Sequence, residues 1–116
     1  MKLMIVDDEV TMRDMLSSIF ELENGVEIFC CQDGEQAIES YSNIDPDVVI
    51  LDLMMPKVDG FKVCKTIKDS DPVRPKIVIL SGLAGEDIRR KCKALGADEV
   101  FFKPVDINAL ITAVMK

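Results

Sequence analysis

The chain has 116 residues, of which 48% are hydrophobic, and this is enough for one domain with a real core. No apolar run approaches the roughly 20 residues that span a bilayer, and the acidic start MKLMIVDDEV does not read as a signal peptide. The formal net charge of −7 disfavours nucleic acid as a ligand of this domain.

The four cysteines form no C-x-x-C pair, and the chain contains no histidine. Both facts argue against a zinc site and favour reduced thiols in a cytoplasmic protein. Because there is no histidine, any reaction that needs an imidazole requires one from another molecule. Cys30 and Cys31 are adjacent in an apolar run and are expected to point to opposite faces of a strand.

Five short apolar runs alternate with amphipathic segments along the whole chain. They are rich in β-branched or aromatic residues and are nearly continuous in apolarity, which is typical of strands buried on both faces of a parallel sheet. These predicted strands cover residues 2–6, 26–31, 47–51, 76–80 and 99–102.

The segments between these runs carry helical periodicity and start signals. In the first, apolar residues recur from Val10 to Phe20, and the helix is expected to stop near Asn24-Gly25. The five helices are predicted to begin after Asp7-Asp8, Asp33, Asp59, Gly85 and Asp106. The order (βα)5 predicts an α/β domain over residues 1–116, with a parallel sheet covered by helices on both faces.

Ligands of open α/β sheets bind at the carboxyl ends of the strands, so the residues there are the candidates for a site. The predicted strands end in Asp7-Asp8, Cys31-Gln32, Asp52, Ser81-Gly82 and Lys103-Pro104. Three carboxylates at one edge repel one another unless a cation binds. An all-oxygen ligand set suits Mg²⁺ rather than zinc.

The remaining polar groups suit phosphoryl transfer. Lys103 contributes a positive charge, and Ser81 contributes a hydroxyl. A divalent cation, a lysine and a hydroxyl that converge on a carboxylate neutralise the oxygens of a phosphoryl group in transit. In this interpretation Asp52 is the nucleophile and becomes an aspartyl phosphate.

Four motifs resemble the receiver domains of two-component response regulators, of the CheY-like single-domain type. They are VDDE (6–9), VILDLMMPKVDG (49–60), ILSGLA (79–84) and GADEVFFKP (96–104). The resemblance implies a flavodoxin-like three-layer sandwich with strand order 2-1-3-4-5. It also implies a switch, not a turnover enzyme, in which Asp52 takes a phosphoryl group from a phosphohistidine of a sensor histidine kinase or phosphotransfer protein. The modified domain then changes its affinity for an output partner.

The same resemblance assigns roles to individual residues. Asp8, Asp52 and the backbone carbonyl of Met54 would bind Mg²⁺ directly, with Mn²⁺ as a substitute, and Asp7 would hold a metal-bound water. Ser81 and Lys103 would contact the phosphoryl oxygens, and in this family the peptide bond after the lysine is cis.

The sequence departs from the family pattern at Val100, where receivers usually carry a Tyr or Phe that moves inward on phosphorylation. A valine has no ring to relocate and little rotamer freedom. We therefore expect the output to rest on movement of residues 82–88 and the fourth helix. Met54 and Leu83 flank the acceptor and are apolar, so they offer no group to orient an attacking water. This predicts slow loss of the phosphoryl group.

Three alternative functions compete with this interpretation. A flavin- or nucleotide-binding module places a phosphate-cradling loop after the first strand, but Asp7-Asp8-Glu9 would repel phosphate. A haloacid-type phosphatase needs a second acid two residues after its nucleophile, where this chain has Met54. A phosphorylation-independent interaction module on the same fold stays open.

The sequence does not identify the cognate kinase or the output partner. It also leaves open whether the protein is a monomer or a phosphorylation-dependent dimer, and whether it is a stand-alone receiver or part of a longer regulator. No membrane association is expected.

Overall fold

The computed structural model describes residues 1–116 and contains five strands and five helices in strict alternation. The strands are β1 (Lys2–Val6), β2 (Glu27–Cys31), β3 (Val48–Leu51), β4 (Lys76–Ser81) and β5 (Glu99–Phe102). The helices are α1 (Val10–Glu21), α2 (Gly34–Ile44), α3 (Gly60–Ser70), α4 (Glu86–Ala94) and α5 (Ile107–Met115). None of the five helices has the length and apolar composition that a membrane-spanning segment requires.

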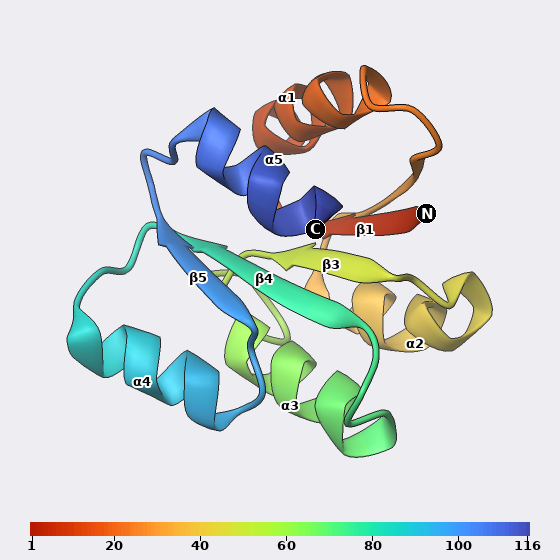
Figure 1. The fold of residues 1–116 in the computed structure, drawn as a ribbon. Helices are drawn as coiled ribbons and strands as arrows, with labels where there is room; N and C mark the ends of the chain where they lie inside the picture. Colours follow the sequence, from red (N-terminus) through yellow and green to blue (C-terminus); the bar gives the residue numbers. More distant parts are fainter.

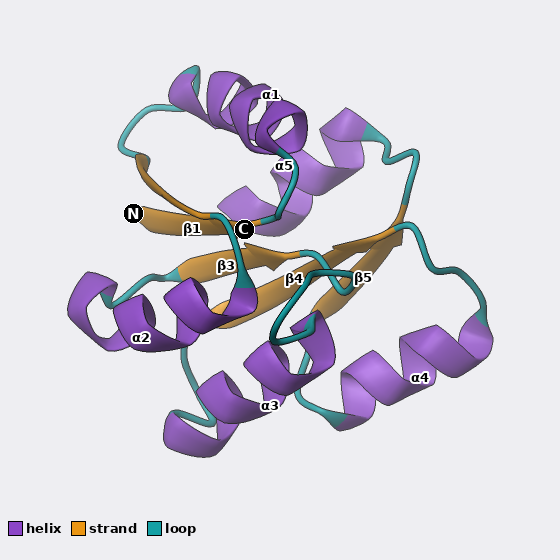
Figure 2. Ribbon diagram, turned by 180° about the vertical axis from the view of Figure 1, so that it is seen from behind, coloured by secondary structure: helices purple, strands orange, loops and turns teal.

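The strands form one parallel sheet in the order β2-β1-β3-β4-β5, which confirms the predicted flavodoxin-like topology. Helices α1 and α5 cover one face, and α2, α3 and α4 cover the other (Figure 1). The view from behind shows the same three layers (Figure 2). Each face has its own apolar cluster, of 10 buried residues under α1 and α5 and of 15 under α2, α3 and α4. Burial of these two clusters against the sheet is the main stabilising contribution.

The prediction that all strands are buried on both faces is right for the centre of the sheet and wrong for its edges. Strand β3 is buried at every position, as are the last four residues of β1, whereas β2 and β5 each contain one buried residue. An edge strand has a neighbour on one side only, so its side chains stay partly exposed. Cys31 is buried and Cys30 is exposed, as strand alternation predicts.

Three of the predicted helix caps are confirmed by side-chain hydrogen bonds. Asp33 Oδ1 accepts from the backbone N–H of Gln36, and Asp59 and Asp106 cap α3 and α5 in the same way. The cap predicted for α1 is wrong, because the N-cap residue is Glu9 and no side chain caps it. Helix α1 also ends at Glu21, before Asn24-Gly25.

Candidate functional site

Three aspartates lie together at the carboxyl edge of the sheet, as predicted. Asp7 and Asp8 follow β1, and Asp52 follows the neighbouring strand β3. The pairing of Val6 with Leu51 brings these strand ends side by side, and the N–H of Asp52 donates to the carbonyl of Val6 at 3.0 Å. One carboxylate oxygen from each aspartate lies within 4.8 Å of the others.

The three carboxylates differ in exposure. Asp7 is 2% exposed and Asp52 is 4% exposed, while Asp8 is open to solvent. Two hydrogen bonds hold Asp7: its Oδ1 accepts from the backbone N–H of Glu9 at 2.9 Å, and its backbone carbonyl accepts from the Arg13 side chain, Nη1, at 2.7 Å. The bond to Glu9 explains why Asp7 does not cap α1, since its carboxylate accepts a hydrogen bond within the turn that precedes the helix.

The loop after β3 packs closely behind Asp52. Asp52 Oδ1 accepts from the N–H of Met54 at 3.4 Å, and the N–H of Gly60 donates to the carbonyl of Leu53 at 2.9 Å. A Cβ atom at Gly60 would lie 2.2 Å from the carbonyl oxygen of Asp52. The glycine therefore allows α3 to begin directly against the backbone that carries the acceptor.

Lys103 reaches the acid cluster from the end of β5. Its Nζ lies 3.5 Å from Asp7 Oδ2 and 3.8 Å from Asp52 Oδ1. Its backbone N–H donates to the carbonyl of Ser81 at 2.7 Å, and the bond to Pro104 is cis, as the resemblance implied. Two of the strand-end groups, Lys103 and Ser81, are therefore linked through the backbone.

Ser81 is fully buried at the end of β4. Its hydroxyl oxygen accepts from the N–H of Leu83 at 2.9 Å, so the side chain is engaged by the loop that leads to α4. A change in the Ser81 rotamer would break this bond and release that loop.

Burial makes ionisation of Asp52 unfavourable. Burial is the largest cause that raises the pKa of Asp52 from its usual 3.8 to about 6, and the charge of Asp7 adds to it. Lys103 and the N–H of Met54 act in the opposite direction. The raised pKa of Asp52 indicates that Lys103 does not fully compensate the negative charge of the three carboxylates. This donor set fits a hard divalent cation.

A cavity of about 430 Å³ opens beside Asp8. The residues Met54 and Leu83, predicted to flank the acceptor, both line it, together with Met55 and Phe61. Met54 is 60% exposed. The access route to the cluster from this side is therefore mostly apolar.

Val100 lies in β5, is 4% exposed and belongs to the buried core cluster on the α2, α3 and α4 face. Its carbonyl accepts from Arg89 Nη1 of α4 at 3.1 Å, and the same guanidinium lies 4.9 Å from the ring centre of Phe102. Sequence reasoning missed this link between α4 and β5. It also missed the support that Gly60 gives to Asp52, although the Asp59-Gly60 pair was a signal of a tight turn.

The fold and the acid cluster define a parallel α/β domain with an acidic site at the carboxyl edge of its sheet. Residues 3–115 match the model of the family described as "Response regulator receiver domain", and the chain belongs to that family. Members are phosphoacceptor signalling switches of two-component systems and not turnover enzymes. They bind Mg²⁺ at an acidic pocket, and they interact with histidine kinases or phosphotransferases and with output domains.

Curated relatives agree with this assignment. Sporulation initiation phosphotransferase F of Bacillus subtilis is 34% identical, over 99% of this chain and 91% of the relative. A probable transcriptional regulator, ycf27, of Guillardia theta is 40% identical over 99% of this chain, which spans 45% of that protein. The regulatory protein AtoC of Escherichia coli is 34% identical, and the match spans 23% of its length. The chain thus covers less than half of these two regulators.

Solved structures show the same fold. The CheX–CheY–BeF3–Mg complex from Borrelia burgdorferi contains a chain that is 32% identical, with a TM-score of 0.89 over 98% of this chain and 86% of that one. The Francisella response regulator 1452 receiver domain is 29% identical, with a TM-score of 0.89 over 98% of this chain and 93% of that one.

Proposed function

We propose that Asp52 is the phosphoacceptor and that its phosphorylation depends on Mg²⁺. The observation that carries this proposal is the convergence of Asp52, Asp7 and Lys103 within one cluster, since Lys103 Nζ lies within 3.8 Å of a carboxylate oxygen of each acid. The similar chain from Borrelia burgdorferi was solved with BeF3 and Mg, which supports the assignment of both ligand types to this edge.

The residues around the acceptor would have two roles, metal binding and contact with the phosphoryl oxygens. Asp8 and Asp52 would bind the metal directly together with the carbonyl of Met54, and Asp7 would hold a metal-bound water. Bound Mg²⁺, or Mn²⁺ in its place, supplies positive charge opposite the phosphoryl oxygens. The buried position of Asp52 keeps bulk water from its carboxylate, and the ammonium of Lys103 lies where it can pair with a phosphoryl oxygen.

The transfer itself is a single displacement. An Asp52 carboxylate oxygen forms a bond to phosphorus while the bond from phosphorus to the donor's imidazole nitrogen breaks. The electron pair stays on that nitrogen, and the imidazole takes up a proton from solvent at neutral pH. This chain has no histidine, so the phosphohistidine belongs to another molecule, a sensor histidine kinase or a histidine phosphotransfer protein.

The donor would dock over α1 and the loop between β5 and α5. An apolar cavity of about 360 Å³ lies there, lined by Met12, Met15, Val105 and Ile107 next to Lys103. Met15 and the neighbouring Val10 are exposed apolar side chains. An apolar surface that adjoins the acceptor's lysine is a suitable contact for a phosphorylated partner helix.

The phosphorylated domain would act by changed affinity for an output protein or output domain. The added charge of about −1.5 to −2 favours a rotamer of Ser81 that donates to a phosphoryl oxygen. That change would release the N–H of Leu83 and alter the loop that leads to α4. A phosphorylation-independent interaction module remains the second candidate, favoured by the buried valine at position 100.

Intact mass after incubation with acetyl phosphate tests the proposal. Wild-type protein with Mg²⁺ should gain one phosphoryl group, and the gain should disappear with EDTA or in Asp52→Asn. Asp14→Asn, which removes an exposed acid of α1, is the matched control and should behave as wild type. Phosphorylation of the Asp52→Asn variant would overturn the assignment, and binding of an output partner that is equal for wild type and Asp52→Asn would favour the second candidate.

A further inference from the structure

The peptide group between Asp7 and Asp8 connects the two acids that β1 brings to the cluster. Its carbonyl oxygen, which belongs to Asp7, accepts from Arg13 Nη1 at 2.7 Å. Because a peptide group is planar, a hydrogen bond to this oxygen fixes the orientation of the whole group, including the bond that leads into Asp8. Arg13 lies in α1, so this contact joins the helix to the segment that carries the acids.

The two acids differ in how else they are held. The N–H of Asp7 donates to the carbonyl of Cys31 at 3.2 Å, and its Oδ1 accepts from the N–H of Glu9 at 2.9 Å. Asp8 is exposed, and neither its backbone nor its carboxylate makes a hydrogen bond to the rest of the chain. Asp8 is thus restrained only through its two flanking peptide groups, by Arg13 on one side and by the Asp7 carboxylate on the other.

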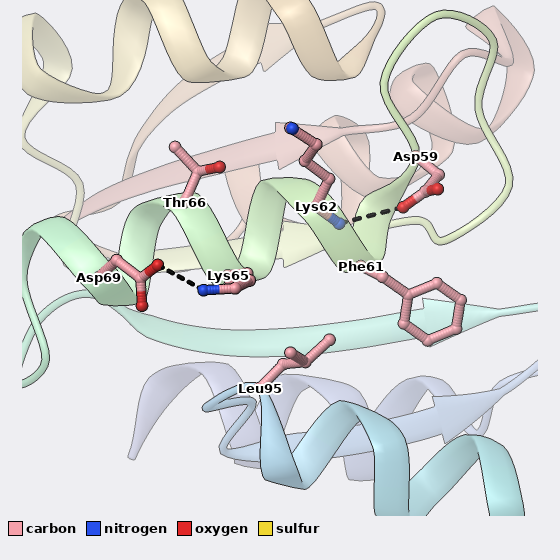
Figure 3. Close-up of a pocket in the computed structure, with 7 residues that line it drawn as sticks. All are labelled: Asp59, Phe61, Lys62, Lys65, Thr66, Asp69 and Leu95. Carbon is pink, nitrogen blue, oxygen red and sulfur yellow. Dashed lines mark hydrogen bonds and ion pairs between the residues drawn. The ribbon is translucent and has the colours of Figure 1, made fainter.

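The guanidinium of Arg13 is available for this contact because no carboxylate holds it. Cations on other helices pair with acids, as Lys65 does with Asp69 at 2.7 Å along α3 (Figure 3). Arg13 is half-buried and takes part in none of the ion pairs of the structure. A hydrogen bond from a charged donor is roughly twice as strong as one between neutral groups, so the bond to the Asp7 carbonyl is a firm restraint.

The main chain of Arg13 supports the same segment. Its N–H donates to the carbonyl of Glu9 at 3.1 Å, which is the N-cap residue of α1. No side chain caps this helix. Arg13 therefore ties α1 to residues 7–9 through both its backbone and its side chain.

We infer that Arg13 is a positioning residue of the metal site, which holds the Asp7–Asp8 peptide group so that Asp8 stays beside Asp52 before Mg²⁺ binds. This inference rests on the function proposed above for the acid cluster. Three carboxylates whose oxygens lie within 4.8 Å of one another repel, and the exposed, unbonded Asp8 is the one that can turn away into solvent. A restraint on its backbone lowers the conformational freedom that metal binding has to remove.

The charge of Arg13 acts in the opposite direction from its position. A guanidinium near the cluster repels a divalent cation, so a role through charge alone predicts tighter Mg²⁺ binding when Arg13 is neutralised. A role through position predicts weaker binding. We expect the loss of position to dominate, because the guanidinium makes no ion pair with the three acids and the charge of a partly exposed group is screened by salt.

A titration of the unphosphorylated protein with Mg²⁺, followed by the NMR amide signals of residues 7–9 and 52–54, tests the inference. Arg13→Gln should raise the Kd for Mg²⁺ about tenfold. Arg13→Lys keeps the charge and a donor for the same carbonyl, and it should recover part of that loss. Arg90→Gln is the matched control, because it removes the same charge from an exposed residue of α4, and it should leave the Kd within about twofold of wild type.

Two measurements separate positioning from a general loss of stability. In the metal-free protein, Arg13→Gln should shift the amide signals of Asp8 and Glu9 while those of β3 stay as in wild type, and urea unfolding checks that the variant is folded. With acetyl phosphate, the Mg²⁺ concentration that gives half the maximal phosphorylation rate should rise about tenfold. The rate at saturating Mg²⁺ should stay within about twofold of wild type, because Asp52 and Lys103 are unchanged.

Unchanged or tighter Mg²⁺ binding in Arg13→Gln would overturn the inference. An equal loss in Arg90→Gln, or slow phosphorylation that saturating Mg²⁺ does not relieve, would also overturn it. A wild-type protein that binds no Mg²⁺ would overturn it together with the proposed metal site. If wild type binds Mg²⁺ and is phosphorylated on Asp52, and Arg13→Gln matches it in both, the role of Arg13 alone is refuted.

Discussion

Lys103 Nζ lies 3.5 Å from Asp7 Oδ2 and 3.8 Å from Asp52 Oδ1, so a single ammonium pairs with two buried carboxylates that follow the neighbouring strands β1 and β3. The pKa of Asp52 stays above its usual value even with this ammonium present. The cluster therefore has a deficit of positive charge that the protein itself does not correct, and this deficit underlies the metal dependence proposed above.

Replacement of Lys103 by methionine keeps the apolar stem and removes the charge. We expect Lys103→Met to destabilise the metal-free protein at pH 7.5 by on the order of 1–3 kcal/mol, because two buried acids lose their partner. Phosphorylation by acetyl phosphate should slow about 10–100-fold. Urea unfolding in EDTA and timed intact mass measure the two effects, with Lys116→Met as the control. Equal stability of the two variants would contradict the role of the charge.

Removal of the Asp52 charge should stabilise the protein without metal. The pKa of Asp52 is about 6 in the folded protein and 3.8 in the absence of the fold, so the folded state binds more protons between these values. Wild-type stability should therefore fall as the pH rises from about 4 to 6. Asp52→Asn should lack this fall and be more stable at pH 7.5 by on the order of 1–3 kcal/mol.

Urea unfolding in EDTA from pH 4 to 8 measures this difference. Asp14→Asn, at an exposed position, should follow the wild-type curve. A wild-type stability that stays level relative to Asp52→Asn across the range would refute the destabilising effect of the buried charge. Mg²⁺ should raise the midpoint of wild type more than that of Asp52→Asn, because it neutralises the cluster.

Of the two glycines near the site, only Gly60 is expected to be sensitive to replacement by alanine. A Cβ at Gly60 would lie 2.2 Å from the carbonyl oxygen of Asp52, whereas a Cβ at Gly82 would meet nothing within 4 Å. Gly60→Ala should cost about 2–3 kcal/mol despite the better helix propensity of alanine. Gly82→Ala should stay within about 0.5 kcal/mol of wild type. Thermal unfolding of both variants measures this, and equal midpoints would refute the close approach.

The fold was predictable because the apolar runs are short, continuous and separated by helical segments, and a parallel sheet is the arrangement that buries such runs. The positions of Asp7 and Asp52 followed from the same logic, since carboxyl ends of neighbouring parallel strands meet at one edge. The ends of β1, β3, β4 and β5 carry the side chains that the sequence analysis predicted there, namely Asp7-Asp8, Asp52, Ser81 and Lys103. The family match agrees with the motifs that contain these residues.

What the sequence left undetermined depends on distances between segments far apart in the chain. The pattern did not reveal that Asp7 is buried while Asp8 is exposed, because that depends on how the turn closes on Glu9. The contact of Arg89 with Val100 requires α4 to lie across β5.

The apolar residue Met54 is expected to prolong the phosphorylated state. Its side chain is 60% exposed beside the cluster and offers no hydrogen bond to an attacking water. Met54→Asn or Met54→Glu should speed loss of the phosphoryl group about tenfold or more. The decay of the phosphorylated mass with time measures the rate. Met115→Gln, at an exposed methionine of α5, is the control, and unchanged decay in the Met54 variants would remove the argument.

Arg89 is the residue through which we expect α4 and β5 to be coupled. Its guanidinium donates to the carbonyl of Val100 at 3.1 Å and lies 4.9 Å from the ring centre of Phe102. With Val100 unable to act as a moving ring, addition of BeF3 and Mg²⁺ should shift amide signals of residues 82–88 and α4 most strongly.

In Arg89→Gln the shifts in α4 should persist while those in β5 shrink, because the link between them is cut. Arg90→Gln removes the neighbouring charge, which pairs with Asp87 in the same helix, and should leave both sets as in wild type. Shifts confined to β5 and the acid cluster, with α4 silent, would show that the signal leaves the site by another route.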